Sequence, residues 1–244
     1  MRKPIMAGNW KMYKTPTEAA DFVIALAPLV KDVHETTMLL CAPFTALQKL
    51  SEAAVGTNIA VGAENLYWED EGAFTGEISG PMLKAVGCTY VIIGHSERRQ
   101  YFGETDETVN KKLFAAIKHR LLPIVCVGET LAQREKGETF KVIEEQVKGA
   151  FQGVTDNHWK SVVVAYEPVW AIGTGKTATP AQAQEVHAFI RKLLPKDVAN
   201  DIRILYGGSV KPENVKELMA QPDIDGGLVG GASLKVDSYV KLVK

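Results

Sequence analysis

Cysteine is scarce in this chain, and neither sign of charge is in excess. The three cysteines are odd in number and lack the spacing of a metal site or a disulfide framework. We therefore expect buried free thiols and a reducing, cytoplasmic setting. Lys and Arg number 28 against 29 Asp and Glu, for a net charge of -1. No long-range positive field attracts nucleic acid or an anionic membrane, although a small anionic ligand needs only a local patch.

Long apolar runs are also missing. The longest stretch without Asp, Glu, Lys or Arg covers residues 36–48, whereas a membrane-spanning helix needs about 20 apolar residues. The first residues include basic side chains but no apolar run of signal-peptide length before Lys11. With 46% hydrophobic and 23% charged residues, the composition is that of an ordinary globular domain and excludes intrinsic disorder.

A regular series of short β-branched or aliphatic runs is present instead. The runs begin near Pro4, Thr37, Ile59, Tyr90, Leu122, Ser161, Ile202 and Gly226. Their mean spacing is about 32 residues, close to the length of a βα unit. No shift in composition and no Gly/Ser/Pro-rich linker divides them, so residues 1–244 are expected to form a single domain.

The segments between these runs have the period of helices. Apolar residues three or four apart recur in four sets: Phe22, Leu26 and Leu29; Val109, Leu113 and Ala116; Ile143, Val147 and Ala150; and Val186, Ile190 and Leu193. Two segments, 15–18 and 179–182, read as an N-cap Thr, a Pro at the first helical position and a capping-box Glu or Gln. They predict helices that begin at residues 16 and 180.

The predicted strands are apolar at consecutive positions, which is typical of a sheet covered on both faces. Two α/β architectures fit this pattern, a closed (β/α)8 barrel and an open doubly wound sheet. Eight units favour the barrel, because eight parallel strands close around an interior that side chains can fill. The sequence therefore predicts one (β/α)8 barrel with eight parallel strands.

Polar residues follow several predicted strands. Asn9 and Lys11 come after the first, His95 after the fourth and Glu167 after the sixth. Parallel strands would bring these residues to one face, where barrels carry their chemistry. Lys11 and His95 also have ordinary interpretations, as a solvated lysine and a structural histidine. Glu167 favours function, because Pro168 holds it extended and a carboxylate is costly to bury at the end of an apolar strand.

Glycine-rich segments follow the last two predicted strands, at residues 207–209 and 230–231. Backbone N–H groups at such places bind phosphate, and the last two strand loops are the usual phosphate site of barrels. Either segment alone would suggest a tight turn, but the two together favour phosphate. Residues 171–178 contain GKT as in a P-loop, yet Trp170 occupies the position of the required first glycine. A dinucleotide pattern at 173–178 follows the wrong strand, so we interpret the segment as a loop that closes over a ligand.

Seven ordered motifs together resemble the triosephosphate isomerase family over nearly the whole chain. They are AGNWKM (7–12), GAFTGEIS (72–79), IIGHSERR (92–99), CVGE (126–129), AYEPVWAIGTGKTA (165–178), YGGSV (206–210) and LVGGASL (228–234). The resemblance implies interconversion of dihydroxyacetone phosphate and glyceraldehyde 3-phosphate through an enediolate, in glycolysis and gluconeogenesis, with no metal and no organic cofactor. The alternatives are another phosphate-binding barrel enzyme acting on a larger sugar phosphate and a non-catalytic barrel that binds phosphorylated ligands.

The resemblance also implies a role for each matching residue. It makes Glu167 the general base and His95 the electrophile, and it assigns Asn9 and Lys11 to the substrate and its developing oxyanion. The backbone that holds phosphate is assigned to Gly173, Ser209, Gly230 and Gly231. Ser96 and Glu97 match family positions that support the reacting groups.

Two features of the third predicted βα loop bear on assembly. Glu64 stands where many family members have Gln, which we interpret as a variation at a strand end or subunit contact. The loop 65–79 has its full length, and in the family it docks into a partner subunit, with the residue at Thr75 near the partner subunit's Asn9 and the partner subunit's Lys11. Its tip carries apolar aromatic residues that are unfavourable on a monomer surface: Tyr67, Trp68 and Phe74. A homodimer is therefore expected.

Overall fold

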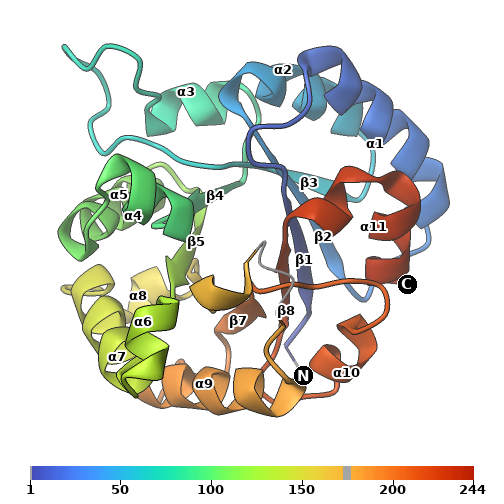
Figure 1. Cartoon of the computed structure of the whole chain (residues 1–244). Helices are drawn as coiled ribbons and strands as arrows, with labels where there is room; N and C mark the ends of the chain where they lie inside the picture. Colours follow the sequence, from blue (N-terminus) through green and yellow to red (C-terminus); the bar gives the residue numbers. More distant parts are fainter. Residues whose placement is uncertain (1, 173–176) are drawn as a thin grey trace.

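Eight parallel strands close into a barrel in the computed structural model of the chain, which describes residues 2–172 and 177–244 (Figure 1). The strands are β1 (Ile5–Asn9), β2 (Thr37–Ala42), β3 (Ile59–Ala63), β4 (Tyr90–Ile93), β5 (Leu122–Val127), β6 (Val163–Tyr166), β7 (Arg203–Tyr206) and β8 (Gly226–Val229). Each strand pairs with the next along the chain, and β8 closes on β1. The predicted barrel is thus confirmed, and its strands begin within two residues of the predicted runs.

Helices surround the barrel (Figure 1). They are α1 (Pro16–Val30), α2 (Phe44–Ala54), α3 (Gly80–Ala85), α4 (Ser96–Phe102), α5 (Asp106–Lys118), α6 (Leu131–Glu135), α7 (Thr139–Ala150), α8 (Asp156–Trp159), α9 (Pro180–Leu193), α10 (Val215–Met219) and α11 (Val236–Val243), with 3-10 turns at Val169–Ala171 and Gly231–Leu234. Capping boxes at Thr15 and Thr179 start α1 and α9 as predicted. No helix within the described residues is both long and apolar enough to cross a membrane.

Both faces of the sheet are buried, which explains the continuous apolar runs of the strands. One cluster fills the barrel and includes Ala7, Ile92, Ile124 and Leu205. A larger cluster lies between the strands and the helices. The three cysteines, Cys41, Cys88 and Cys126, are buried and free, as expected.

One predicted apolar stripe is wrong at its last position. Phe22 and Leu26 of α1 are buried, but Leu29 is 45% exposed and Val30 is buried instead. At 100° per residue, Val30 lies 40° from Leu26 around the helix and Leu29 lies 60° away on the other side. The core face therefore continues through the i+4 position.

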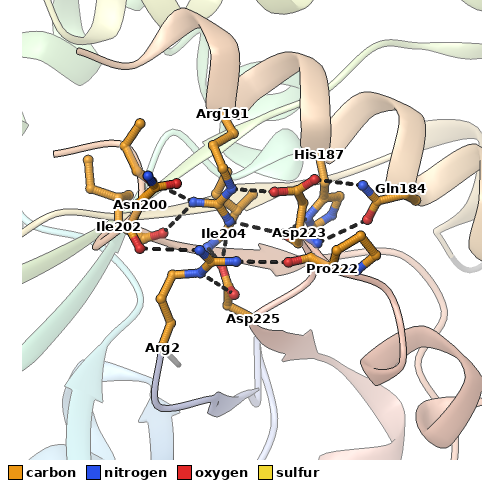
Figure 2. A network of polar contacts seen from close by, with 11 residues as sticks. Arg2, Gln184, His187, Arg191, Asn200, Ile202, Ile204, Pro222, Asp223 and Asp225 are labelled. Atoms are coloured by element: carbon orange, nitrogen blue, oxygen red, sulfur yellow. Dashed lines mark hydrogen bonds and ion pairs between the residues drawn. The ribbon is translucent and has the colours of Figure 1, made fainter. Parts of the chain in front are cut away.

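A polar network closes the amino-terminal ends of β7 and β8 (Figure 2). The Arg191 guanidinium of α9 donates to Asp225 at 2.7 Å and to Asp223 at 2.5 Å. Arg2 donates to the other oxygen of Asp225 at 2.6 Å, and the Ile204 N–H donates to Asp225 at 2.9 Å. The network joins α9, the starts of β7 and β8 and the segment before β1 at the end of the barrel opposite the predicted site.

Candidate active site

The polar residues predicted at strand ends gather at the carboxyl end of the barrel. A cavity of about 560 Å3 lies there. Its lining includes the predicted residues Asn9, Lys11, His95, Ser209, Gly230 and Gly231. The structure thus brings together residues from β1, β4, β7 and β8 that are far apart in sequence. Gly173 lies outside the described residues, and Glu167 does not line this cavity.

His95 caps the amino terminus of α4 with its own ring. Its Nδ1 accepts a hydrogen bond from the Glu97 N–H at 3.2 Å, so this nitrogen carries no proton. The proton resides on Nε2, which lies 2.9 Å from Oε1 of Glu167. The imidazole is therefore a neutral donor whose orientation is set by the first turn of the helix. This arrangement agrees with the helix dipole, which disfavours a positive ring at that position.

Glu167 is 2% exposed and its carboxylate faces the start of α4. Besides the contact to His95, Oε2 accepts from the Ser96 N–H at 2.9 Å and Oε1 accepts from the Ser96 hydroxyl at 3.1 Å. In this position Glu167 lines a smaller cavity of about 290 Å3 behind the larger one. A substrate in the larger cavity can therefore react with the carboxylate only after the carboxylate leaves Ser96.

The surroundings of Glu167 determine the charge of the pair. Burial raises the pKa of Glu167, but His95 and the two donors of Ser96 outweigh it and lower the pKa below its usual range. The group is therefore an ionised base. Burial lowers the pKa of His95, while the Glu167 carboxylate raises it and outweighs burial. Once the carboxylate moves towards a substrate, burial remains and favours the neutral imidazole.

Lys11 places a cation beside the larger cavity. Its backbone has a φ of 55°, a left-handed conformation that is costly for a non-glycine residue and that typically persists at functional sites. The Lys11 N–H donates to the Asn9 side chain at 3.2 Å. The ammonium group forms an ion pair with the Glu97 carboxylate. Glu97 therefore connects the lysine of β1 to the turn that carries His95.

The glycines after β7 and β8 differ in how much space surrounds them. A Cβ at Gly207 would lie 2.8 Å from Cγ of Glu167. A Cβ at Gly230 would meet only Lys11, at 3.5 Å, and one at Gly231 would meet no described atom within 4 Å. Gly207 thus makes room for the base, whereas Gly230 and Gly231 leave open backbone beside the lysine. Such a backbone can donate N–H groups to a phosphate.

Glu129 was not assigned a role from the sequence. It is fully buried and accepts hydrogen bonds from the Tyr166 hydroxyl at 3.1 Å, Trp170 Nε1 at 3.0 Å and Arg134 at 3.1 Å. Because Tyr166 precedes Glu167 and Trp170 follows it, Glu129 fixes the backbone on both sides of the base. The one signal in the sequence is its place two residues after β5, close to the strand end as for the other site residues.

The fold and site define a (β/α)8-barrel enzyme in which a buried carboxylate lies beside an imidazole, and the imidazole lines one cavity with a lysine and glycine-rich backbone. Among residues 2–172 and 177–244, no three His, Cys, Asp or Glu side chains are grouped as they would be around a metal ion. The cavity is lined from the ends of β1, β4, β7 and β8 and by Ile172. Residues 173–176, which carry most of the P-loop and dinucleotide patterns, lie outside the described residues.

Known proteins identify the family. The family model described as triosephosphate isomerase matches residues 4–244. A triosephosphate isomerase of Moorella thermoacetica is 62% identical over 246 residues, covering 100% of this chain and 98% of the relative. Another, of Carboxydothermus hydrogenoformans, is 60% identical, covering 100% and 99%. The crystal structure of triosephosphate isomerase from Bartonella henselae superposes with a TM-score of 0.90 at 38% identity, over 98% of this chain and 97% of that one. The chain belongs to the triosephosphate isomerase family and is an isomerase.

Proposed function

We propose that the protein interconverts dihydroxyacetone phosphate and D-glyceraldehyde 3-phosphate, a step shared by glycolysis and gluconeogenesis. One observation supports this most directly. The ionised carboxylate of Glu167 lies 2.9 Å from Nε2 of His95, and the imidazole lines the same cavity as Lys11 and the glycine-rich backbone. This is the set of groups that proton transfer next to a phosphate-bearing carbonyl compound requires.

Glu167 is the general base of this proposal. Moving a carbonyl by one carbon requires removal of a proton from the neighbouring carbon, which leaves an enediolate. The same carboxylate can then return the proton to the adjacent carbon, so one ionised group of low pKa serves both steps. The carboxylate must first exchange its Ser96 donors for the substrate.

His95 and Lys11 stabilise the charge that develops on oxygen. When Glu167 leaves His95, the Nε2–H becomes free to donate to the substrate oxygen. Lys11 adds a fixed positive charge beside the cavity, and the Asn9 side chain holds the Lys11 backbone. Donors that already point at the developing oxyanion lower the barrier without reorganisation. A neutral histidine at a helix amino terminus in this enzyme is itself a well-known case.

Phosphate is held mainly by backbone groups in this proposal. Ser209, Gly230 and Gly231 line the cavity next to Lys11, and Gly173 of the loop 168–178 would complete the site when the loop closes. Closure would keep water from the enediolate, which otherwise can eliminate phosphate. Because the anion is bound locally, the chain as a whole needs no positive charge.

We propose a homodimer that docks the loop 65–79 into a partner subunit. Residues 71–77 are exposed, Phe74 among them, and the Tyr67 ring stacks on Trp68 at 4.0 Å. A second cavity of about 300 Å3 borders Asn9 and Lys11, and its rim includes exposed apolar side chains of Met12 and Phe102. Thr75 would enter this cavity of the partner. Sedimentation should show a dimer, and an active monomer at micromolar concentration would refute the proposal.

The buried free thiols also support a cytoplasmic location. The function is tested by isomerisation of glyceraldehyde 3-phosphate by the purified protein, with a chelator present and no added metal or nucleotide. We expect rapid formation of dihydroxyacetone phosphate. Turnover of a larger sugar phosphate alone would favour another barrel enzyme, and binding of phosphorylated ligands without turnover would favour the non-catalytic alternative.

A further inference from the structure

The side chain of Gln146, in α7, holds both backbone polar groups of one residue at the end of β5. Its Oε1 accepts from the Gly128 N–H at 2.7 Å, and its Nε2 donates to the Gly128 carbonyl at 3.0 Å. Gly128 lies one residue beyond the end of the strand at Val127. The amide of Gln146 thus gives Gly128 the pair of hydrogen bonds that a neighbouring strand would give. Both groups of one residue are fixed from a helix on the outside of the barrel.

Gly128 touches the backbone of the proposed base. A Cβ at Gly128 would clash with the carbonyl oxygen of Glu167 and would lie 2.7 Å from its carbonyl carbon. The Glu167 N–H donates to the Val127 carbonyl at 2.8 Å, and the Val169 N–H donates to the Glu129 carbonyl at 3.1 Å. The segment that carries the base therefore rests on residues 127–129 along its length.

Packing leaves one side of Gly128 open. The cavity of about 290 Å3 behind Glu167 is lined by Val127, Gly128, Gln146 and Glu167 itself. Open space beside a backbone segment removes the neighbouring atoms that would otherwise fix its position. On this open side, hydrogen bonds hold Gly128 in place, and Gln146 supplies two of them.

We propose that Gln146 is a positioning residue for the reaction, acting through Gly128 on the backbone of Glu167. By holding the backbone of Gly128 it sets the point from which the carboxylate swings from Ser96 to the substrate. This inference rests on the proposed function. Phosphate binding at the ends of β1, β7 and β8 is remote from Gln146, so a loosened peptide should lower kcat and leave KM nearly unchanged. A base misplaced by about 1 Å costs on the order of 100-fold in rate.

The variant Gln146→Met tests this by keeping the length of the side chain and removing both hydrogen bonds. We expect kcat for glyceraldehyde 3-phosphate to fall by about 10- to 100-fold, with KM within about twofold. Gln184→Met is a matched control. Gln184 holds Asp223 by a similar pair of hydrogen bonds, at 2.6 Å and 3.0 Å, in the network at the other end of the barrel (Figure 2). Gln184→Met should lose stability to a similar extent as Gln146→Met, but its kcat should stay within about twofold of that of the unchanged protein.

Gln146→Glu adds a second measurement, the pH dependence of kcat, which would not change if Gln146 served only the stability of the fold. The ionised carboxylate accepts from the Gly128 N–H but repels the Gly128 carbonyl, whereas the protonated acid restores both hydrogen bonds. The ratio of its kcat to that of the unchanged protein should therefore rise as the pH falls, while circular dichroism shows the same fold at each pH. This variant also serves if Gln146→Met does not fold.

Provided that the unchanged protein isomerises triose phosphate, three results would overturn the inference. They are a kcat of Gln146→Met within twofold of normal, an equal loss of kcat in Gln184→Met, or a ratio for Gln146→Glu that does not change with pH. If the unchanged protein does not isomerise triose phosphate, the proposed function fails instead and this inference fails with it.

Discussion

Two buried carboxylates occupy opposite ends of the barrel and differ in their partners. Asp225, before β8, is held by the guanidinium groups of Arg2 and Arg191 and by a backbone N–H (Figure 2). Glu167, after β6, is held by the imidazole of His95 and by two neutral donors of Ser96. Both are almost completely buried. Permanent cations surround the first, and neutral groups that can find other partners surround the second.

This difference separates a carboxylate held in ion pairs from one that can exchange its hydrogen-bond partners, as the proposed mechanism requires. Removing one partner of a buried ion pair typically costs about 3–5 kcal/mol, because the other charge stays buried and unpaired. A hydrogen bond contributes about 1 kcal/mol net, although those to charged groups contribute somewhat more. A substrate can therefore displace the Ser96 donors of Glu167 and compensate them with its own contacts. No comparable exchange is available to Asp225.

The largest expected effect comes from changing Glu167, at the carboxyl end of the barrel. Glu167→Gln should lower turnover by about 10²- to 10⁴-fold, because the amide cannot accept the substrate proton. The midpoint of thermal unfolding should change little, since the amide still accepts a hydrogen bond from its neutral neighbours. Steady-state isomerisation rates and thermal unfolding of the same preparation check both. Near-normal turnover of this variant would exclude Glu167 as the base.

Glu167→Asp is the matched control at the same position. It keeps the charge but withdraws the carboxylate by one methylene, about 1 Å, so a loss on the order of 100-fold is expected. Substrate binding should stay near normal, because neither variant touches the backbone of Ser209, Gly230 or Gly231.

The next largest effect is expected from changing Asp225, at the amino-terminal end of the barrel. Asp225→Ala leaves two guanidinium groups without this carboxylate and should lower the free energy of unfolding by about 3–5 kcal/mol. The folded fraction should retain kcat within about twofold, since the network lies away from the cavity. Urea unfolding and rates normalised to the folded fraction measure the two effects. Asp201→Ala, at an exposed position, controls for loss of charge alone. A large fall in the normalised kcat of Asp225→Ala would show that the two ends are not independent.

A third carboxylate, Glu64, sharpens the comparison because Oε1 is buried with no hydrogen-bond partner within the described part of the chain. Burial raises the pKa of Glu64 from 4.5 to about 8, with Glu97 adding to the rise and Lys11 opposing it. The folded protein therefore keeps a proton that the unfolded chain releases above pH 4.5. Linkage then requires the contribution of Glu64 to the free energy of unfolding to fall as the pH rises from about 4.5 to about 8.

Glu64→Gln should remove this dependence and give the smallest effect of the series. At pH 8 the variant should be more stable by about 1–3 kcal/mol, and near pH 4.5 the difference should vanish. Urea unfolding at several pH values provides the measurement, with Glu52→Gln, at an exposed position, as the control. Curves for Glu64→Gln and the unchanged protein that stay parallel from pH 5 to 8 would contradict the assigned burial of the charge.

The place of Glu167 at the end of a strand could be predicted from the sequence, whereas the ion pairs of Asp225 could not. Glu167 stands after an apolar run and before Pro168, a pattern visible within a few residues. Asp225 precedes a strand, and its partners Arg2 and Arg191 are 223 and 34 residues away. A single sequence shows which residues are charged but not which of them meet across the fold.

The same limit separates the predictable from the unpredictable parts of the fold and site. Strands and the starts of α1 and α9 follow from local patterns, namely apolar runs and capping boxes. The orientation of the Glu167 carboxylate towards Ser96 depends on how the segments after β4 and β6 lie beside each other across β5, and the sequence contains no trace of it. Gln146 occupies a partly exposed position of α7, so the pattern of the helix gives no hint that its side chain holds Gly128.

Exchange of solvent deuterium tests most directly whether the carboxylate at the carboxyl end moves the proton. The triose phosphates are incubated with enzyme in D2O, and deuterium on the carbon next to the carbonyl is measured. The proposed mechanism predicts incorporation by the unchanged protein and a loss of incorporation in Glu167→Gln as large as its loss of turnover. Incorporation by Glu167→Gln at the rate of the unchanged protein would show that another group moves the proton, and would contradict the central claim.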